Sequence, residues 1–290
     1  MGGEWSLVAF TITGQLAAGL YLFIGFPIYF GLGDAGTRLG GGGRLDFLLA
    51  VLGLLAAATI LSLFHLHHPV KAYRTLVNLG RSWLSREILS LLFFGAVVAA
   101  LTILEWRAAG GPSPGSRLLF VLGGLAAVLL LTTMSRLYML PSMPTWNRIY
   151  TPLSFFLTSA VLGACATAFL LSLPGGSPPA PRPYLILAFS GLAASFLNSA
   201  LLTPVYGVFG VKPRQTLRPS GTGSAFLHAV RLFLLAAGGV ILVTVLATHE
   251  QGSLERLGRA PRMLLAAFVV AVAGEVSGRF LFYGLSDRRQ

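Results

Sequence analysis

The sequence is poor in charged residues and contains a single cysteine. Charged residues make up 10% of the 290 residues and hydrophobic residues 55%, whereas soluble domains carry about 25% charged residues. This composition excludes an ordinary soluble domain and favours a chain that lies in a lipid bilayer. The one cysteine, Cys165, can form no internal disulfide and cannot hold an iron–sulfur cluster, which generally needs four cysteine ligands. Any such cluster must be carried by another chain.

The most prominent feature of the sequence is a set of eight long apolar runs. They cover about residues 6–32, 45–66, 87–106, 117–140, 150–173, 184–203, 225–247 and 262–284. Each is long enough to cross a hydrocarbon core as a helix, which takes about 20 residues. The sequence therefore predicts an all-α integral membrane protein, a single polytopic domain over residues 1–290 with a bundle of eight transmembrane helices. Residues 1–6 contain no Lys or Arg, so no cleaved signal peptide is expected.

The distribution of basic residues predicts an orientation in the membrane. Eight crossings place both termini on one side, here called the terminal face. The connections and span ends on this face carry eleven Lys or Arg residues, against eight on the opposite face. The positive-inside rule then favours a cytoplasmic terminal face in the inner membrane. Flanking charges and anionic lipid headgroups explain the net charge of +12, so no nucleic-acid partner is predicted.

Histidines gather where the second span meets the terminal face, in the segment Ser62-Leu63-Phe64-His65-Leu66-His67-His68-Pro69. Histidine can exchange a proton near neutral pH, so His65 at the mouth of a membrane helix suggests proton-coupled chemistry at a lipid–water boundary. A quinone is the lipid-borne partner that suits this chemistry. In the alternative interpretation, His65 binds carbonyl groups at the helix C-terminus. His67 and His68 are expected at the membrane interface. On the opposite face, Gly40-Gly41-Gly42-Gly43 is typical of a plain connection.

Motifs along the whole chain resemble the membrane anchor subunits of dimethyl sulfoxide reductases. In chain order they are Gly14-Gln15 with Ala18-Gly19; Ser62-Leu63-Phe64-His65-Leu66 with Pro69, Ala72, Leu84-Ser85 and Glu87-Ile88; Pro144-Thr145-Trp146 with the run from Thr151 to Thr158; and Ala273-Gly274-Glu275 with Gly278-Arg279 and Phe282-Tyr283-Gly284. Each motif alone is weakly specific, and their order and spacing together make the match strong. The resemblance fades between about residues 204 and 224.

The resemblance implies an eight-helix anchor that exchanges electrons between the quinone pool, menaquinone or ubiquinone, and a partner iron–sulfur subunit. A molybdopterin subunit would then act on the terminal substrate, in anaerobic respiration or in sulfur-compound oxidation. The anchor itself would hold no heme and no iron–sulfur cluster, and would not catalyse the terminal reaction. The histidine that matches His65 is implicated in the family's quinol site, so His65 is expected to exchange protons with the quinone.

Five further residues are candidates for lining the quinone site or relaying protons: Gln15, Glu87, Arg136, Glu275 and Arg279. Glu275 and Arg279 are four positions apart and share a helix face, so the alternative is an internal salt bridge that orders the bundle. Glu87 begins the third span, where it either caps the helix or carries protons away from His65. Gln15 makes either an interhelical hydrogen bond or a ligand contact.

Basic and aromatic residues at the terminal face are the predicted docking site for the iron–sulfur subunit: Arg74, Trp146 and Arg148. Trp146 could instead be a simple interfacial aromatic. Two other functions stay open. A secondary transporter would show repeats and broken helices near the membrane midplane, and no convincing repeat is visible. A quinone-linked cytochrome would bind heme b, for example through His65 and His228. Otherwise the sequence predicts no metal site.

Overall fold

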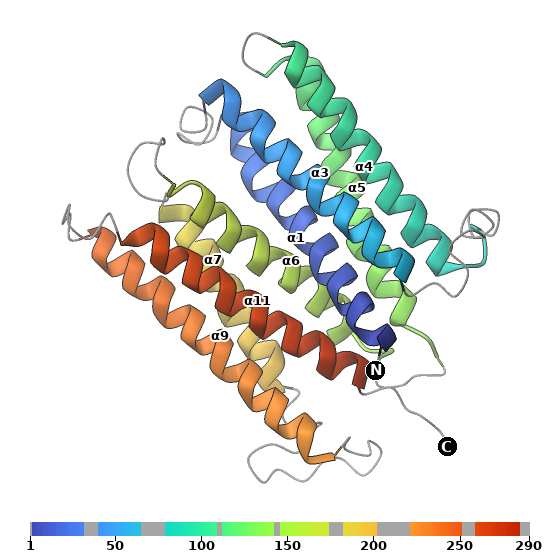
Figure 1. Ribbon diagram of the computed structural model, residues 1–290, viewed down its shortest axis with the longest axis vertical. Helices are drawn as coiled ribbons and strands as arrows, with labels where there is room; N and C mark the ends of the chain where they lie inside the picture. The colour runs from blue at the N-terminus through green and yellow to red at the C-terminus, as the bar shows by residue number, and fades with distance from the viewer. Residues whose placement is uncertain are drawn as a thin grey trace. The chain divides into compact units, whose positions relative to one another are not determined.

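The computed structural model describes residues 2–31, 40–64, 79–108, 112–141, 146–173, 182–201, 221–250 and 259–284 (Figure 1). These residues form eight long helices: α1 (Gly2–Phe30), α3 (Gly40–Phe64), α4 (Trp83–Arg107), α5 (Pro114–Tyr138), α6 (Tyr150–Leu170), α7 (Arg182–Leu201), α9 (Gly221–Glu250) and α11 (Ala260–Gly284). All eight are long and apolar enough to cross a membrane. The prediction of an all-α membrane fold with eight spans is therefore confirmed.

One predicted connection is helical. α3 begins at Gly40, so the glycine run at 40–43 forms its first turn and the expectation of a plain connection there is wrong. Glycine is a poor helix former, but a backbone close to lipid satisfies its own hydrogen bonds best as a helix. The helix formed by the apolar run at 45–66 therefore continues in the N-terminal direction through the four glycines.

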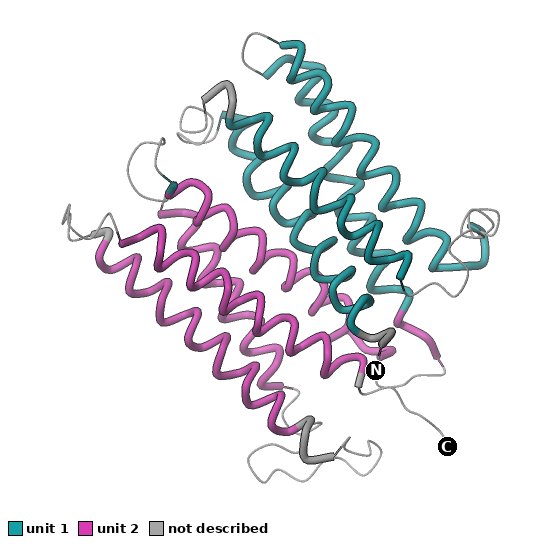
Figure 2. Tube along the Cα trace, viewed as in Figure 1, with its two compact units in different colours: residues 1–137, 173–177 teal, residues 138–172, 178–290 magenta. Residues whose placement is uncertain are grey.

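The chain separates into two compact units of four helices each (Figure 2). Unit 1 comprises residues 1–137 and 173–177 and holds α1, α3, α4 and nearly all of α5; unit 2 comprises residues 138–172 and 178–290 and holds α6, α7, α9 and α11. In unit 1, α3 packs against both α1 and α4. In unit 2, α6 packs against α7, α7 against α9, α9 against α11 and α11 against α6, so the four helices close a ring. That both units act as one membrane domain stays a prediction.

Successive helices run in opposite directions within each unit (Figure 1). Each unit has one end that we call its terminal end. In unit 1, α1 and α4 begin there while α3 and α5 end there. In unit 2, α6 and α9 begin there while α7 and α11 end there. A residue near the start of α1, α4, α6 or α9, or near the end of α3, α5, α7 or α11, therefore lies near the terminal end of its unit.

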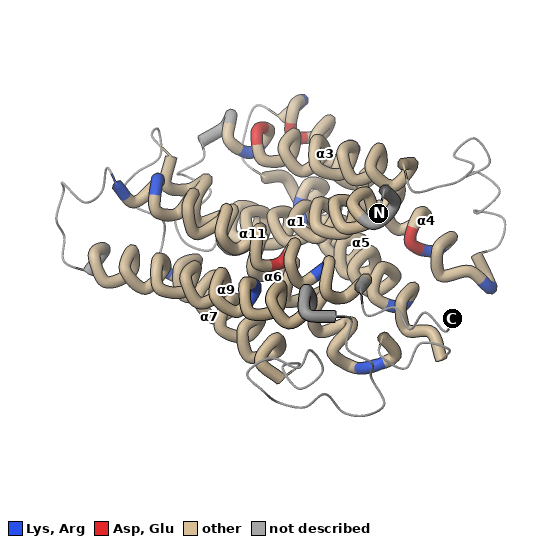
Figure 3. Tube along the Cα trace, turned by 60° about the horizontal axis from the view of Figure 1, so that its bottom comes forward, with Lys and Arg blue, Asp and Glu red and all other residues tan. Residues whose placement is uncertain are grey.

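The helices carry few charged residues along most of their length (Figure 3), and many large apolar side chains are exposed on their outer surface. Leu125 is 64% exposed, Val240 66% and Phe233 71%. A water-soluble protein rarely exposes an apolar surface of this extent. In a bilayer the same surface contacts lipid tails, so the pattern fits membrane insertion.

Close packing in unit 1 depends on small residues at helix contacts. Tyr21 of α1 is fully buried and its hydroxyl donates to the carbonyl oxygen of Phe120 in α5 at 3.1 Å. The Tyr21 side chain lies directly against Gly123, where an added Cβ would overlap the phenol oxygen. The Phe120 ring also stacks on Tyr29, with centroids 4.8 Å apart. A residue without a side chain therefore lets α1 and α5 approach closely, as is common between membrane helices.

Candidate functional site

Glu87 is a buried acid near the terminal end of unit 1. α4 begins at Trp83 because the hydroxyl of Ser82 accepts the backbone N–H of Ser85 at 3.3 Å, which is an N-cap interaction. Glu87 therefore lies inside the helix, and the alternative in which Glu87 caps the third span is wrong. Its side chain is 2% exposed, and no described residue gives Oε1 a hydrogen bond or lies within ion-pair distance of the carboxylate. Buried acids are normally paired, so Glu87 is a candidate functional group.

The residue predicted to exchange protons with a quinone, His65, lies outside the described residues. The same holds for His67, His68 and Arg74. α3 ends at Phe64, one position before His65, at the terminal end of unit 1.

Two other predicted residues of unit 1 differ in their surroundings. Gln15 is fully buried in α1, inside unit 1, where the hydroxyls of Ser90 in α4 and Thr133 in α5 also meet at 2.8 Å. Arg136 is exposed in the last turn of α5. Gln15 is therefore positioned for contacts inside the bundle, whereas Arg136 is positioned for contacts at the surface of the terminal end.

The opposite end of unit 1 holds a buried ion pair that the sequence analysis did not predict. Arg44 Nε of α3 lies 3.3 Å from Glu105 Oε2 of α4, and the two side chains are 14% and 1% exposed. The sequence contained a signal, since Glu105 stands near the end of an apolar run, and Arg44 just before the start of another. The glycine run just before Arg44 is typical of a plain connection and gives no indication of this pair.

The two buried acids of α4 lie on one face of the helix at its two ends. Glu87 and Glu105 are eighteen positions apart, which is five turns and about 27 Å of helix. Between them, the same face presents Phe94, Val98 and Leu101, each 0% exposed. The buried face of α4 is therefore polar at both ends and apolar through the middle.

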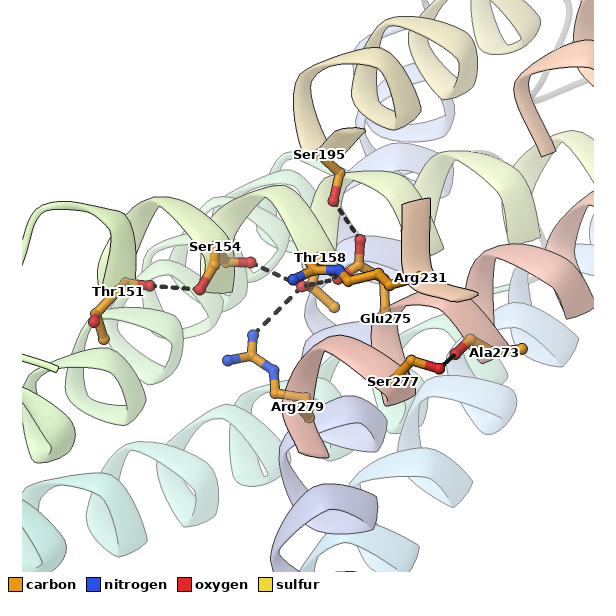
Figure 4. A network of polar contacts seen from close by, with 9 residues as sticks. All are labelled: Thr151, Ser154, Thr158, Ser195, Arg231, Ala273, Glu275, Ser277 and Arg279. Carbon is orange, nitrogen blue, oxygen red and sulfur yellow. Dashed lines mark hydrogen bonds and ion pairs between the residues drawn. The ribbon is translucent and has the colours of Figure 1, made fainter. Parts of the chain in front are cut away.

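A polar network of four helices fills the interior of unit 2 (Figure 4). Glu275 of α11 is its centre: Oε1 accepts a hydrogen bond from Ser195 of α7 at 2.5 Å, and Oε2 accepts one from Thr158 of α6 at 2.7 Å. Arg231 of α9 donates from Nη2 to the same Oε2 at 3.3 Å and forms an ion pair with it. Because every helix of unit 2 contributes one group, this network ties the bundle together.

Arg279 lies beside this network without pairing with Glu275. Its guanidinium group is 3.7 Å from the centre of the Phe155 ring, and Nη2 donates to the hydroxyl of Thr158 at 3.4 Å. Glu275 and Arg279 share a helix face, as predicted, but the ion pair that orders the bundle links α11 to Arg231 of α9. Gly278 makes this possible, since a Cβ at that position would overlap the Arg231 guanidinium group.

Buried polar residues of α7 and α9 surround the same network. Asn198 is 4% exposed, and Ser199 and His228 are fully buried. The sequence singles out His228 but not Asn198 or Ser199. The signal for these two is that they are polar residues within an otherwise apolar run.

An aromatic cluster closes the terminal end of unit 2. The indole N–H of Trp146 donates to the carbonyl oxygen of Phe282 at 2.9 Å, and the two rings stack with centroids 5.3 Å apart. Tyr138, the last residue of α5, packs edge-on against Trp146 at 5.7 Å. The connection that enters α6 is thereby fastened to the end of α11. Arg148 follows on this connection and is exposed, so it faces outward from a fixed support.

Within the described ranges, no group of three or more His, Cys, Asp or Glu side chains is arranged to hold a metal ion. Cys165 is buried in α6.

Eight membrane-spanning helices, with ionisable side chains buried inside each four-helix unit, define a polytopic membrane subunit. A family described as DMSO reductase anchor subunit (DmsC) matches residues 1–285. The chain belongs to this family. It is 30% identical over 288 residues to the C chain of anaerobic dimethyl sulfoxide reductase from Escherichia coli (strain K12), and the match covers 97% of this protein and 94% of that relative.

Two further relatives agree with this assignment. The anaerobic dimethyl sulfoxide reductase subunit YnfH of Escherichia coli (strain K12) is 28% identical over 293 residues, and the C chain of the Haemophilus influenzae enzyme is 27% identical over 292 residues. In both, the match covers 97% of this protein and 94% of the relative. The predictions of family and of a membrane anchor subunit are thus confirmed, and neither the transporter nor the heme alternative finds support.

Proposed function

We propose that this protein oxidises a quinol, menaquinol or ubiquinol, and passes the electrons to an iron–sulfur subunit of a molybdopterin oxidoreductase complex. A quinol gives up two electrons and two protons. The electrons go to clusters on the partner subunit, and the protons go first to side chains of this protein. The observation that carries the proposal is the match to the anchor family over residues 1–285. The names of the relatives make dimethyl sulfoxide the proposed terminal acceptor of the complex.

His65 is the proposed first proton acceptor, and Glu87 the proposed relay. The support is that α3 ends one residue before His65 at the same end of unit 1 where Glu87 is buried near the start of α4. Imidazole can cycle between its two protonation states at neutral pH. A carboxyl group without a described partner is available to pass the proton on. Gln15 and Arg136 are the proposed supporting contacts in unit 1.

Glu275 and Arg279 have different proposed roles in unit 2. Both oxygens of Glu275 already accept hydrogen bonds, which favours a structural role over proton relay. Among the described residues, Arg279 donates one side-chain hydrogen bond, from Nη2 to Thr158. Its other N–H groups can therefore bind a ligand.

The orientation of the complex follows from the same proposal. The docking face carries Arg74, Trp146 and Arg148, and both termini lie on that side of the inner membrane, facing the cytoplasm. A quinone near this face leaves a short route for electrons to a cluster outside the membrane. The opposite side would leave most of a hydrocarbon core of about 30 Å to cross without a carrier in this protein.

Replacement of the buried acid tests the relay. Glu87→Gln keeps the size of the side chain and removes its proton-carrying carboxyl group, so quinol oxidation by the assembled complex should fall about a hundredfold, as for the loss of a general acid–base group. The measurement is steady-state turnover with quinol and with a redox dye that reduces the partner directly. Asp46→Asn, the same change at an exposed acid of α3, should leave both rates unchanged. Normal quinol turnover in Glu87→Gln would remove Glu87 from the pathway.

Crosslinking tests the docking face. In a Cys165→Ala background, Arg148→Cys places a single thiol at the terminal end of α6, and Leu173→Cys places one just beyond its other end. Both positions are exposed. A short thiol-to-amine crosslinker should join residue 148, and not residue 173, to the iron–sulfur subunit in isolated membranes. Crosslinks from residue 173 without crosslinks from residue 148 would place the partner on the other side.

A further inference from the structure

Unit 2 contains buried polar atoms that the network around Glu275 does not use. Neither amide atom of Asn198, nor the hydroxyl of Ser199, nor Nε of Arg231 has a hydrogen-bond partner among the described residues. Their side chains are buried: Asn198 is 4% exposed, Ser199 0% and Arg231 5%. A buried polar atom without a partner destabilises the folded protein, because it loses its hydrogen bonds to water and gains none in return. Native proteins normally supply such atoms with a partner, from water or from a ligand.

These atoms converge on one region of the bundle. Ser195, Asn198 and Ser199 are three and four positions apart, so they share one face of α7. Ser195 donates to Glu275, which shows that this face looks into the bundle. Arg231 reaches the same carboxylate from α9, the helix packed beside α7. Asn198 stands three residues before the end of α7, about 5 Å along the helix axis, so the region lies close to the terminal end.

We propose that Asn198, Ser199 and Arg231 form a second binding site for a quinone headgroup, in unit 2. This inference rests on the proposed function. A quinone carbonyl is an acceptor, and it finds donors in the Asn198 amide N–H, the Ser199 hydroxyl and the Arg231 Nε–H. A quinol hydroxyl is a donor, and it finds an acceptor in the Asn198 carbonyl oxygen. One amide side chain therefore serves both redox states of the ligand.

The charges of the network suit a quinone that accepts or loses single electrons. Arg231 and Arg279 bring two positive charges, and Glu275 brings one negative charge, so one positive charge is in excess among these three residues. Electrostatic interactions are stronger away from water. A headgroup that carries one extra electron is negatively charged, and the excess positive charge stabilises it.

The lipid side of the same helices gives room for the tail of a quinone. Three large apolar residues face outward near the terminal ends of α7 and α9, and a fourth lies further along α9: Leu197 (62% exposed), Leu201 (65%) and Phe226 (71%), then Phe233 (71%). An isoprenoid tail can lie along these side chains in the bilayer while the headgroup is bound by the polar atoms of the inner face. The site then resembles other ligand sites, which combine an apolar lining with a few placed polar groups.

The test replaces Asn198 by an apolar side chain of similar size in the complete complex. Asn198→Leu should raise the KM for a short-chain quinol about tenfold, the effect of losing a headgroup hydrogen bond worth about 1.4 kcal/mol. Turnover with a redox dye should not change. Ser190→Leu, on the exposed side of the same helix, is the matched control and should leave the KM unchanged. An unchanged KM in assembled Asn198→Leu would mean that these atoms bind water only.

Photolabelling gives a second readout that needs no variant. An azido-quinone irradiated with the wild-type complex should label peptides of α7 and α9 as well as those of unit 1. Labels confined to α1, α3, α4 and α5 would overturn the second site. The failure of this inference can be told from failure of the proposed function: a wild-type complex that oxidises no quinol refutes the function, whereas normal quinol oxidation without label in unit 2 refutes the second site alone.

Discussion

His65→Ala is expected to abolish quinol oxidation by the complex, with a loss of at least about a hundredfold, while dye-driven turnover stays intact. The imidazole is the proposed first acceptor of the quinol protons, and alanine cannot replace it. A redox dye delivers electrons directly to the partner's clusters, so its rate does not depend on the membrane anchor. The measurement compares the two donors in the same preparation of membranes.

The neighbouring histidines provide a control. His68→Ala removes an imidazole three positions away that is expected to lie at the membrane interface, and it should change quinol turnover by less than about twofold. If His65→Ala assembles normally and retains wild-type quinol kinetics, His65 has no part in the mechanism. If both variants lose activity equally, the histidine cluster acts through the local structure of the segment and not through one proton acceptor.

Glu275→Leu is expected to destabilise the protein by about 3–5 kcal/mol, the cost of leaving a buried partner charge without its counter-ion. Arg231 and Arg279 would then lie in the interior of unit 2 with no carboxylate between them. The variant should therefore accumulate poorly in membranes and unfold at a lower temperature in detergent. Both quantities can be measured by thermal unfolding and by quantification of the protein in isolated membranes.

A second substitution separates lost charge balance from lost packing. The double variant Arg231→Leu with Glu275→Leu removes both members of the ion pair and should recover much of the stability, because replacing a buried pair by apolar residues is often nearly neutral. Ser277→Ala, in the same helix, removes only a hydroxyl bonded to its own backbone at Ala273 and should cost less than about 1 kcal/mol. A double variant as unstable as Glu275→Leu alone would show that the ion pair is not the source of the stability.

The fold was predictable because its main determinant is local. A run of about 20 apolar residues can satisfy its backbone in lipid only as a helix, so each span could be predicted without knowledge of its neighbours. The helix ends were less predictable. The glycines at 40–43 join α3, and Ser82 rather than Glu87 determines where α4 begins.

The site was predicted in part, because its residues act in sets that are far apart in the sequence. The position of Glu275 on the same face as Arg279 follows from helix periodicity, but its pairing with Arg231 depends on how α9 packs against α11. Asn198 could not be predicted as a site residue, because a single amide in an apolar run does not indicate which helices pack against it. For Glu87, burial without a described partner is a property of the folded bundle alone.

The apolar middle of the buried face of α4 also affects whether protons can cross the membrane along this helix and so dissipate the membrane potential. Phe94, Val98 and Leu101 separate Glu87 from Glu105, and none of these side chains offers an atom to which a proton can be handed. The middle of this α4 face therefore offers no path for protons between the two acids. If quinol is oxidised beside Glu87, as proposed above, its protons cannot cross the membrane along this face, and a membrane potential worth about 2.3 kcal/mol per charge at 100 mV is not dissipated there.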